Sequence, residues 1–413
     1  MVSSFFPTKQ NAMSRLTPFA AVFALLLMGV SSVATASPMA KPAPSSGFQG
    51  FLGRLWPLAH ARGVTHETFA AALSGVTPDQ DVVDLTKKQS EFVKPIWEYL
   101  ASATSANRLD RGAKMAGVNA STLDAIENRY GVDRSVILGV WGMETNFGGF
   151  TGGKDVIRSL ATLASVGYRG TYFRDELIGA LLILQQHHVA RADFKGSWAG
   201  ARGQTQFMPS SFQKFAVDFD GDGKKDIWTD VPDALASTAN YLKLNGWQAG
   251  LPWGFEVSIP HGFDYHMTRL VFDDWTRQGV RRADGQAMPR SGEANLFFPA
   301  GADGPAFLVT DNFDVIKRYN NSDAYALGVA MLGDRIYGAG PVRAAWPVDD
   351  PILGLQQRVQ LQEQLVALGY DVGEPNGRIG SRTREAIRDF QDKHGLRPDG
   401  YAGRRVLEAL RVR

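Results

Sequence analysis

The sequence predicts a mainly helical α+β protein that carries a small strand-rich insertion and ends in a separate three-helix unit. Apolar residues recur every three or four positions over most of residues 50–251 and again over 312–337, which is the period of a helix. Between these stretches, over residues 254–310, short runs of β-forming residues alternate with Gly/Pro turns. A segment with three prolines and two glycines at 338–351 separates the C-terminal residues from the rest.

Composition places the chain among ordinary globular proteins. Its 413 residues suffice for two or three domains, and 44% hydrophobic against 21% charged residues allow a sizeable apolar core. The formal net charge of +2 provides no basic field, so we do not expect nucleic acid as a partner. Because the chain contains no cysteine, disulfides, thiolate metal sites and cysteine nucleophiles are excluded.

Residues 1–36 are predicted to be a secretory signal peptide. Two basic residues precede an apolar run over 16–30, and small residues ending in Ala-Thr-Ala at position 36 provide a cleavage site. The alternative is a retained membrane anchor, but this run is short for a membrane span, and no cysteine follows that could carry a lipid. We therefore expect export, a Pro/Ser-rich leader over 37–49, and no stable membrane insertion after cleavage.

The individual elements follow from local pattern. Apolar spacing in the first helical stretch predicts helices over 88–101, 121–129, 134–145, 171–188 and 232–245. In the insertion, β-branched and aromatic residues predict strands over 255–259, 295–298 and 307–309. We interpret residues 339–351 as a linker and residues 352–413 as an independent unit.

The C-terminal unit is too small for an elaborate active site and suits binding. Apolar residues mark three helix faces, namely Leu361, Leu365 and Leu368, then Ala386, Ile387 and Phe390, then Val406, Leu407 and Leu410. The run NGRIGSRT…AIRDFQ…HGLRPDGYAG over 376–403 resembles the three-helix peptidoglycan-binding module of bacterial wall enzymes. It departs from that module by Asn376 in place of the usual Asp and by Arg404-Arg405 near where a threonine often follows.

One carboxylate stands out in the helical stretch. The segment VILGVWGMETNFGG over 136–149 predicts a nearly unbroken apolar helix that ends at Glu144 and is stopped by paired glycines. Burial among apolar neighbours and the negative end of the helix dipole should both raise the pKa of Glu144. A glutamate that is protonated near neutral pH is suited to general-acid attack on a glycosidic oxygen. The alternative is an ordinary last-turn glutamate paired with a neighbouring arginine.

A second segment, KGSWAGARGQTQFMPSSF over 195–212, has a Gly-rich turn that would let backbone approach a sugar chain, or would simply pack tightly. Further motifs follow in order: VPDA at 231–234, NYL at 240–242, GW at 246–247, RYN at 318–320 and YALGV at 325–329. Together with Glu144 they resemble the lytic murein transglycosylase B family over residues 50–338. The resemblance implies a lysozyme-like α+β catalytic domain, peptidoglycan as substrate and a periplasmic location.

The resemblance also implies roles for individual residues. Glu144 matches the sole catalytic acid/base, which would protonate the oxygen between N-acetylmuramic acid and N-acetylglucosamine. It would then assist attack by the muramic acid 6-hydroxyl, giving 1,6-anhydromuramic acid ends without a cofactor. Substrate-binding positions that match are Ser197, Gln206, Tyr319, Asn320, Tyr325 and, less closely aligned, Tyr99. Rings and amides suit saccharides, although each tyrosine alone is more typical of core packing.

An acidic loop is the candidate metal site. Asp218, Asp220 and Asp222, followed by Gly223, match the start of an EF-hand loop, but its twelfth position is Thr229 rather than glutamate. In the resembling family a later aspartate closes the site, which here indicates Asp233, with the Lys224 carbonyl as a further ligand. We expect a structural Ca²⁺; a metal-free acidic turn is the alternative.

Two other functions remain open at this point. A hydrolytic muramidase would need a second carboxylate near Glu144, for which Asp133, Asp155 and Glu176 are candidates. A catalytically silent peptidoglycan-binding scaffold would keep the cleft without the chemistry. Other wall-synthesis or wall-remodelling proteins are further candidate partners.

Overall fold

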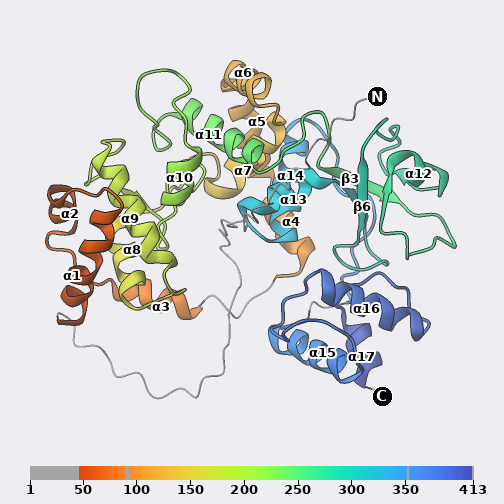
Figure 1. Ribbon diagram of the computed structural model, residues 1–413. Helices are drawn as coiled ribbons and strands as arrows, with labels where there is room; N and C mark the ends of the chain where they lie inside the picture. Colours follow the sequence, from red (N-terminus) through yellow and green to blue (C-terminus); the bar gives the residue numbers. More distant parts are fainter. Residues whose placement is uncertain (1–45, 89–93, 351–352, 412–413) are drawn as a thin grey trace, which may run out of the picture.

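The computed structural model describes residues 46–88, 94–350 and 353–411. The predicted signal peptide and most of the predicted leader lie outside these ranges. Figure 1 shows one group of helices on the left, a second group in the centre, a sheet on the right and a three-helix unit below the sheet. The predicted mainly helical α+β fold is confirmed.

The first helices form the left-hand group, and the next ones lead into the centre (Figure 1). Their bounds are α1 Ser46–Ala61, α2 His66–Leu73, α3 Gln80–Lys88, α4 Ile96–Ala103, α5 Ala106–Val118 and α6 Ala120–Tyr130. The single helix predicted over 88–101 is wrong at its start, because α3 ends at Lys88 and α4 begins after Pro95. Proline at the N-cap fits this boundary, since it disfavours helical backbone in the residue before it.

The remaining helices complete this part of the chain. They are α7 Arg134–Thr145, α8 Val156–Ser165, α9 Tyr172–Gln185, α10 Pro209–Phe215, α11 Val231–Leu244, α13 Asp311–Tyr319 and α14 Asp323–Ile336. Of these, α8 and α9 lie in the left-hand group (Figure 1). Two short strands, β1 Lys154–Asp155 and β2 Lys195–Gly196, pair antiparallel beside α8. A continuous apolar core runs through both helix groups and includes Leu138, Leu181 and Leu327.

Helices α7 and α14 pack unusually close together because glycines face each other's backbone. A Cβ added at Gly139 would lie 2.1 Å from the Val329 carbonyl oxygen, and one added at Gly333 would lie 2.1 Å from that of Ser135. No other residue type fits at such separations. These two glycines therefore fix the distance between α7, which carries Glu144, and α14, which carries Tyr325 in its first turn.

The insertion is a five-stranded antiparallel sheet with the strand order β4-β6-β7-β3-β5. Its elements are β3 Gly254–Ser258, β4 Arg269–Val271, α12 Phe272–Arg277, β5 Arg281–Arg282, β6 Glu293–Phe297 and β7 Ala306–Val309. The three predicted strands are present. The two additional strands are short and arginine-containing, so no apolar alternation marks them in the sequence. A separate apolar cluster around Phe272, Trp275 and Leu308 packs the sheet and α12 together.

The C-terminal unit consists of α15 Leu355–Ala367, α16 Ser381–Lys393 and α17 Arg404–Arg411 around its own apolar cluster. Eight of the nine predicted core positions are buried. Leu368 is the exception: α15 ends at Ala367, and Leu368 is 48% exposed as the C-cap. The prediction that it shares the buried face is wrong because the helix ends one residue too early.

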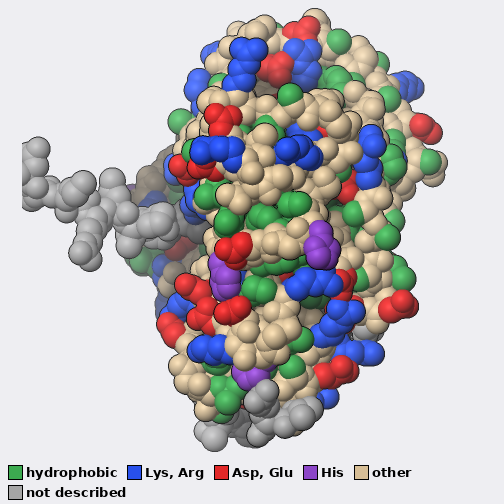
Figure 2. All heavy atoms as spheres, turned by 90° about the vertical axis from the view of Figure 1, so that its right-hand side faces the viewer, with side chains coloured by type: hydrophobic (Ala, Val, Ile, Leu, Met, Phe, Trp, Pro, Cys, Tyr) green, Lys and Arg blue, Asp and Glu red, His purple; other side chains and the backbone are tan. Residues whose placement is uncertain are grey.

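The segment 339–350 has no regular secondary structure but is fastened to the insertion. The backbone amides of Arg343 and Ala344 donate to the carboxylate of Glu256, and Trp346 packs against Trp97 with 6.3 Å between ring centroids. None of the helices in the described ranges is long and apolar enough to cross a membrane. Figure 2 shows acidic and basic side chains interspersed over the face formed by the insertion and the C-terminal unit.

Candidate active site

Glu144 lies in the last turn of α7, whose bounds are those predicted from the sequence. Asp133 caps the opposite end by accepting from the Ser135 amide. The predicted stop at the paired glycines is wrong: the C-cap is Asn146, in the left-handed conformation with φ 51°, and Phe147 follows with φ 57°. Asparagine tolerates this region better than most residues, so α7 ends at Thr145, three residues before the first glycine, Gly148.

Tyr325 reaches Glu144 from the first turn of α14. Its hydroxyl donates to Oε1 of Glu144 at 2.6 Å, and its ring is buried. The N-cap Ser322 accepts from the Tyr325 amide and fixes this turn. Glu144 itself is partly exposed, and no other hydrogen bond to its carboxyl is formed by the described residues. One carboxyl oxygen therefore remains open to a ligand.

The surroundings change the acidity of this carboxyl. Burial raises the pKa of Glu144 to about 7, while the hydrogen bond from Tyr325 opposes the rise because it stabilises the charged form. At neutral pH a substantial fraction of Glu144 is thus protonated. A carboxyl with this pKa can both donate and accept a proton near pH 7.

Two further tyrosines surround the same carboxyl. Burial and, next in size, the charge of Glu144 raise the pKa of Tyr99 and of Tyr319 above the ordinary value, so both remain neutral donors. The ring of Tyr99 on α4 packs where Gly328 leaves room beside Met143. The hydroxyl of Tyr319 at the end of α13 donates to the Thr205 carbonyl at 2.7 Å.

Asn320 follows Tyr319 and ends α13. It is 7% exposed, and its Oδ1 atom is buried without a hydrogen-bond partner in the part of the chain that the structure describes. A buried acceptor of this kind is rare, and a bound water or ligand is the usual explanation.

The other two predicted substrate residues lie in the loop that follows β2. The Ser197 hydroxyl accepts from the Ala201 amide at 3.0 Å and closes the Gly-rich turn. Gln206 is buried with φ 55°, and its Nε2 donates to the carbonyls of Thr151 and Gly203. In this structure the Gln206 amide nitrogen thus holds the loop after Glu144 against the Gly-rich segment.

Sequence reasoning missed Gln204, which ties this segment to α7. Its Oε1 accepts from Trp141 Nε1 at 2.9 Å, its Nε2 donates to the Trp228 carbonyl, and its own carbonyl accepts from Thr145. Its place in the GQTQ motif was the available signal, but spacing alone does not tell which of the two glutamines faces α7.

None of the three candidate second carboxylates is paired with Glu144. Asp133 caps the far end of α7, Asp155 caps α8 and binds Arg191 at 2.8 Å, and Glu176 accepts two hydrogen bonds from Ser210. No carboxylate among the described residues contributes to the raised pKa of Glu144. The site therefore has one carboxyl where a hydrolytic glycosidase uses two.

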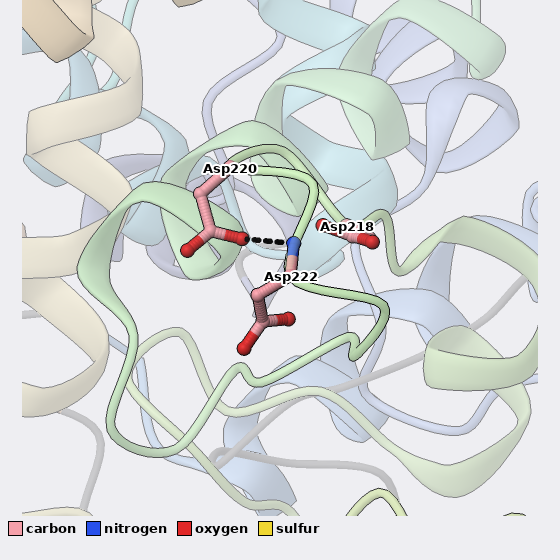
Figure 3. Close-up of side chains that lie close together, drawn as sticks. All are labelled: Asp218, Asp220 and Asp222. Atoms are coloured by element: carbon pink, nitrogen blue, oxygen red, sulfur yellow. Dashed lines mark hydrogen bonds between the residues drawn. The ribbon is translucent and has the colours of Figure 1, made fainter.

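The acidic loop after α10 brings three carboxylates together. Oxygens of Asp218, Asp220 and Asp222 lie within 4.8 Å of one another. Figure 3 shows the three side chains together on the loop. Backbone amides shape the loop: those of Gly221 and Gly223 donate to Asp218, and that of Lys224 donates to Asp222. Hard oxygens at this spacing fit a Ca²⁺ ion.

The structure places Asp233 apart from this group. It is 1% exposed, and its two oxygens accept from the amides of Phe219 and Asp226 at 2.6 and 2.7 Å. Burial first, then the charges of Asp230 and Asp220, raise its pKa, although the two amides oppose the shift. Asp233 thus anchors both ends of the loop to α11.

A helix-end carboxyl that is half protonated at neutral pH, set among buried tyrosines in a mainly helical α+β domain, defines a lysozyme-like, glycan-directed class of protein. Family comparison agrees. A transglycosylase SLT domain model matches residues 47–334, so the chain belongs to this family. A peptidoglycan binding domain model matches residues 355–410. The predicted resemblances of both parts are confirmed.

Known relatives extend this result. Membrane-bound lytic murein transglycosylase B of Escherichia coli is 36% identical over 217 residues, which is 50% of this chain and 58% of that protein. SltB3 of Pseudomonas aeruginosa, solved with NAG-anhNAM-pentapeptide, is 46% identical with a TM-score of 0.84, covering 88% of this chain and 99% of that one. Slt35 of Escherichia coli, solved with calcium, is 28% identical with a TM-score of 0.59, covering 71% and 93%.

Proposed function

We propose that this protein is a lytic transglycosylase that cleaves the MurNAc–GlcNAc β-1,4 bond of peptidoglycan and forms 1,6-anhydromuramic acid ends. The observation that carries the proposal is the lone carboxyl of Glu144, with a pKa near 7 and Tyr325 as its hydrogen-bond donor. Structures of SltB3 contain NAG-anhNAM-pentapeptide and NAG-NAM-pentapeptide, which correspond to the product and substrate of such a reaction.

Glu144 serves both halves of the reaction. Its protonated carboxyl donates to the glycosidic oxygen while the bond from that oxygen to C1 of MurNAc breaks, with the substrate's acetamido oxygen supporting the positive charge. The resulting carboxylate then takes the proton of the MurNAc 6-hydroxyl as its oxygen bonds to C1. Glu144 is thereby reprotonated and no water is consumed. Attack by a tethered hydroxyl has a high effective molarity, so a second carboxylate is unnecessary.

Tyr325 supports the charged intermediate state of Glu144. Its hydroxyl donates to Oε1, so it stabilises the carboxylate that exists between the two proton transfers. The raised pKa of Tyr325, caused first by burial and then by the charge of Glu144, keeps this hydroxyl protonated. Tyr325 therefore limits how far burial raises the pKa of the acid.

The remaining predicted residues would line the glycan site. The buried Oδ1 atom of Asn320 has no partner among the residues that the structure describes, and an amide or hydroxyl group of a sugar would supply one. Tyr99 and Tyr319 present rings and neutral hydroxyls beside Glu144, and Ser197 and Gln206 shape the facing loop. Aromatic rings can stack on the apolar faces of sugar rings.

The C-terminal unit would bind the wall polymer and raise the local concentration of substrate. We propose residues 50–338 and 352–413 as the two domains, with 339–351 between them. We propose that the predicted signal peptide directs the protein to the periplasm, where its substrate, peptidoglycan, is located. Other wall enzymes remain candidate partners.

Calcium would stabilise the acidic loop rather than take part in the reaction. Asp218, Asp220 and Asp222 would hold the ion, with the Lys224 carbonyl as a further ligand. Asp233, whose two oxygens accept from backbone amides, would brace the loop from α11 without binding the ion. The calcium complex of Slt35 supports this choice of metal. The chemistry of Glu144 requires no cofactor.

The test is the chemistry of the product ends. Purified sacculi are digested in heavy-oxygen water, and the soluble fragments are analysed by mass spectrometry. A lytic transglycosylase gives anhydromuramoyl ends that carry no label, because the 6-hydroxyl replaces water as the nucleophile. Labelled reducing ends would establish a hydrolase instead, and an absence of any cleavage would favour the binding scaffold.

A further inference from the structure

The C-terminal unit contacts the catalytic part close to Glu144. Arg384 on α16 bonds the Asp323 carboxylate at 2.5 Å, and its guanidinium also lies over the ring of Phe297, 5.8 Å from the centroid. Lys317 on α13 binds the other oxygen of Asp323 at 2.8 Å. Asp323 is thus held between one cation of its own domain and one of the C-terminal unit.

Asp323 is the first residue of α14 and lies only two positions before Tyr325. It belongs to the α13–α14 connection, residues 319–325, which also contains Tyr319 and Asn320. In this short segment the Ser322 side chain caps Tyr325, and Tyr325 in turn donates to Glu144. A displacement of Asp323 would therefore be passed directly to the hydroxyl that bonds the catalytic carboxyl.

Charge and burial make the Arg384–Asp323 contact more than an exposed ion pair. Burial opposes ionisation of Asp323, yet the charges of Arg384 and Lys317 together hold its pKa below the ordinary value. The side chains of Asp323 and Arg384 are 23% and 30% exposed. Pairs that are shielded in this way are screened less by solvent than surface pairs.

A second contact between the C-terminal unit and the catalytic part, at Asp303, does not involve the α13–α14 connection. Asp303, in the loop between β6 and β7, binds both Arg397 and Arg405 of the C-terminal unit. The neighbouring Ala302 amide donates to Asp399 at 2.8 Å. These bonds hold the two parts together through a loop of the insertion, and none of them involves residues 319–325. The two contacts can therefore be removed separately.

We propose that Arg384 is a positioning residue for the cleavage reaction: by binding Asp323 it holds the α13–α14 connection, and with it Tyr325, against Glu144. The C-terminal unit then contributes to the catalytic rate itself, in addition to any binding of the wall. This inference rests on the proposed lytic transglycosylase function.

The test measures turnover of short soluble peptidoglycan fragments, on which tethering to a sacculus plays no part. The full chain is compared with Arg384→Ala, Arg384→Lys and the matched control Asp303→Ala. We expect Arg384→Ala to lower kcat by about ten- to a hundred-fold with KM within about twofold, since small misplacements of catalytic groups are costly. Arg384→Lys should recover part of kcat, because it retains the cation but not the planar group over Phe297. Asp303→Ala should stay within about twofold of wild type.

Two results would overturn the proposal. One is an unchanged kcat in Arg384→Ala; the other is an equal loss in Asp303→Ala, which would assign the effect to docking in general. If Arg384→Ala lacks a cooperative melting transition, Arg384→Gln, which keeps the length of the stem and a donor, is judged by the same criteria. Failure of the wild type to cleave the fragments would refute the proposed function, whereas active wild type with unaffected variants would refute only this inference.

Discussion

Glu144 and Glu176 are two glutamates in apolar surroundings, and their environments differ in one decisive respect. Burial is the largest cause that raises the pKa of each. Glu176 is 3% exposed and fully engaged: the amide and hydroxyl of Ser210 donate to its two oxygens at 2.9 and 2.6 Å, and the Arg202 charge lies nearby. Glu144 has one donor, Tyr325, and an oxygen without a partner among the described residues.

This is the difference that we expect between a structural glutamate and the proposed catalytic one. Glu176 uses its charge and both oxygens to cap the start of α10, where unpaired amides favour a carboxylate. Glu144 keeps one oxygen available and has a pKa close to the working pH. Burial by itself therefore does not identify a catalytic acid; burial with incomplete hydrogen bonding does.

The largest contrast is expected from replacing each glutamate by glutamine. Glu144→Gln removes the proton donor and acceptor, so glycan cleavage should fall by about 10²–10⁴-fold while the melting temperature is retained. Glu176→Gln leaves buried donors of Ser210 without an ionised acceptor and should lower the free energy of unfolding by about 1–3 kcal/mol. Thermal melting and turnover of soluble fragments measure both effects. If Glu176→Gln folds but loses a comparable amount of activity, the assignment of a structural role to Glu176 and a catalytic role to Glu144 would be contradicted.

The difference in stability between wild type and Glu144→Gln should also depend on pH in a defined direction. The folded-state pKa, about 7, is above the ordinary value of 4.5, so the folded protein binds more protons than the unfolded chain between these pH values. The stability that wild type gains from this group is therefore complete below about pH 4.5, is lost as pH rises to about 7, and changes little above that. At pH 8 the glutamine variant should melt at the same temperature as wild type or higher. A lower melting temperature at that pH would be inconsistent with a Glu144 carboxyl whose pKa is raised by burial.

The next effect concerns the close packing of α7 against α14, which surrounds Glu144 but not Glu176. Gly139→Ala would place a methyl group against the Val329 carbonyl and force α7 and α14 apart. We expect a loss of about 1–3 kcal/mol in the free energy of unfolding, measured by denaturant titration, together with reduced activity. Gly153→Ala, where an added Cβ meets no atom within 4 Å, is the matched control. Equal stability of the two variants would show that the helices are not in close contact.

A smaller and more specific effect is expected from Tyr325→Phe. The Tyr325 hydroxyl stabilises the Glu144 carboxylate and lowers its pKa, so its removal should raise that pKa further. The alkaline limb of the pH–rate profile should then move to higher pH, with a lower maximal rate. A limb that stays in place or moves to lower pH would exclude Tyr325 as the donor.

The smallest effect is expected at the acidic loop, which should influence stability and leave chemistry unchanged. Millimolar Ca²⁺ should raise the melting temperature of the full chain by a few degrees, because an ion that binds only the folded state stabilises it by mass action. The double variant Asp218→Ala/Asp222→Ala should lose this increase and keep its activity. No change in the wild-type melting curve would leave the loop as a metal-free acidic turn.

The sequence predicted local features well. The bounds of α7 were evident because apolar residues fill almost every position of one helix, and the apolar faces of the C-terminal helices were evident from their spacing. Leu368 and the start of α4 were misplaced, since helix ends depend on caps that periodicity does not contain. Glu144 was identifiable as a candidate from its own neighbours.

Contacts between segments that are distant in the sequence could not be predicted from local residue patterns. The bond between Tyr325 and Glu144 joins residues 181 positions apart and was not predicted; the family resemblance indicated only that Tyr325 belongs to the substrate site. Gln204 and Arg384 were not recognised, because their partners are set by how α7, α14 and the C-terminal unit pack. The glycines at 139 and 333 did not by themselves predict the close approach of α7 and α14, because glycine occurs in helices for many other reasons.

The central claim is that Glu144 exchanges protons near neutral pH without a partner carboxylate. The most direct measurement is an infrared difference titration of wild type against Glu144→Gln, following the carboxyl band of this one side chain. The account predicts that the band of the protonated carboxyl disappears around pH 7 in wild type and is missing from the variant. Loss of the band near the ordinary value of 4.5 would contradict it, because Glu144 would then be ionised at neutral pH and unable to act as the acid.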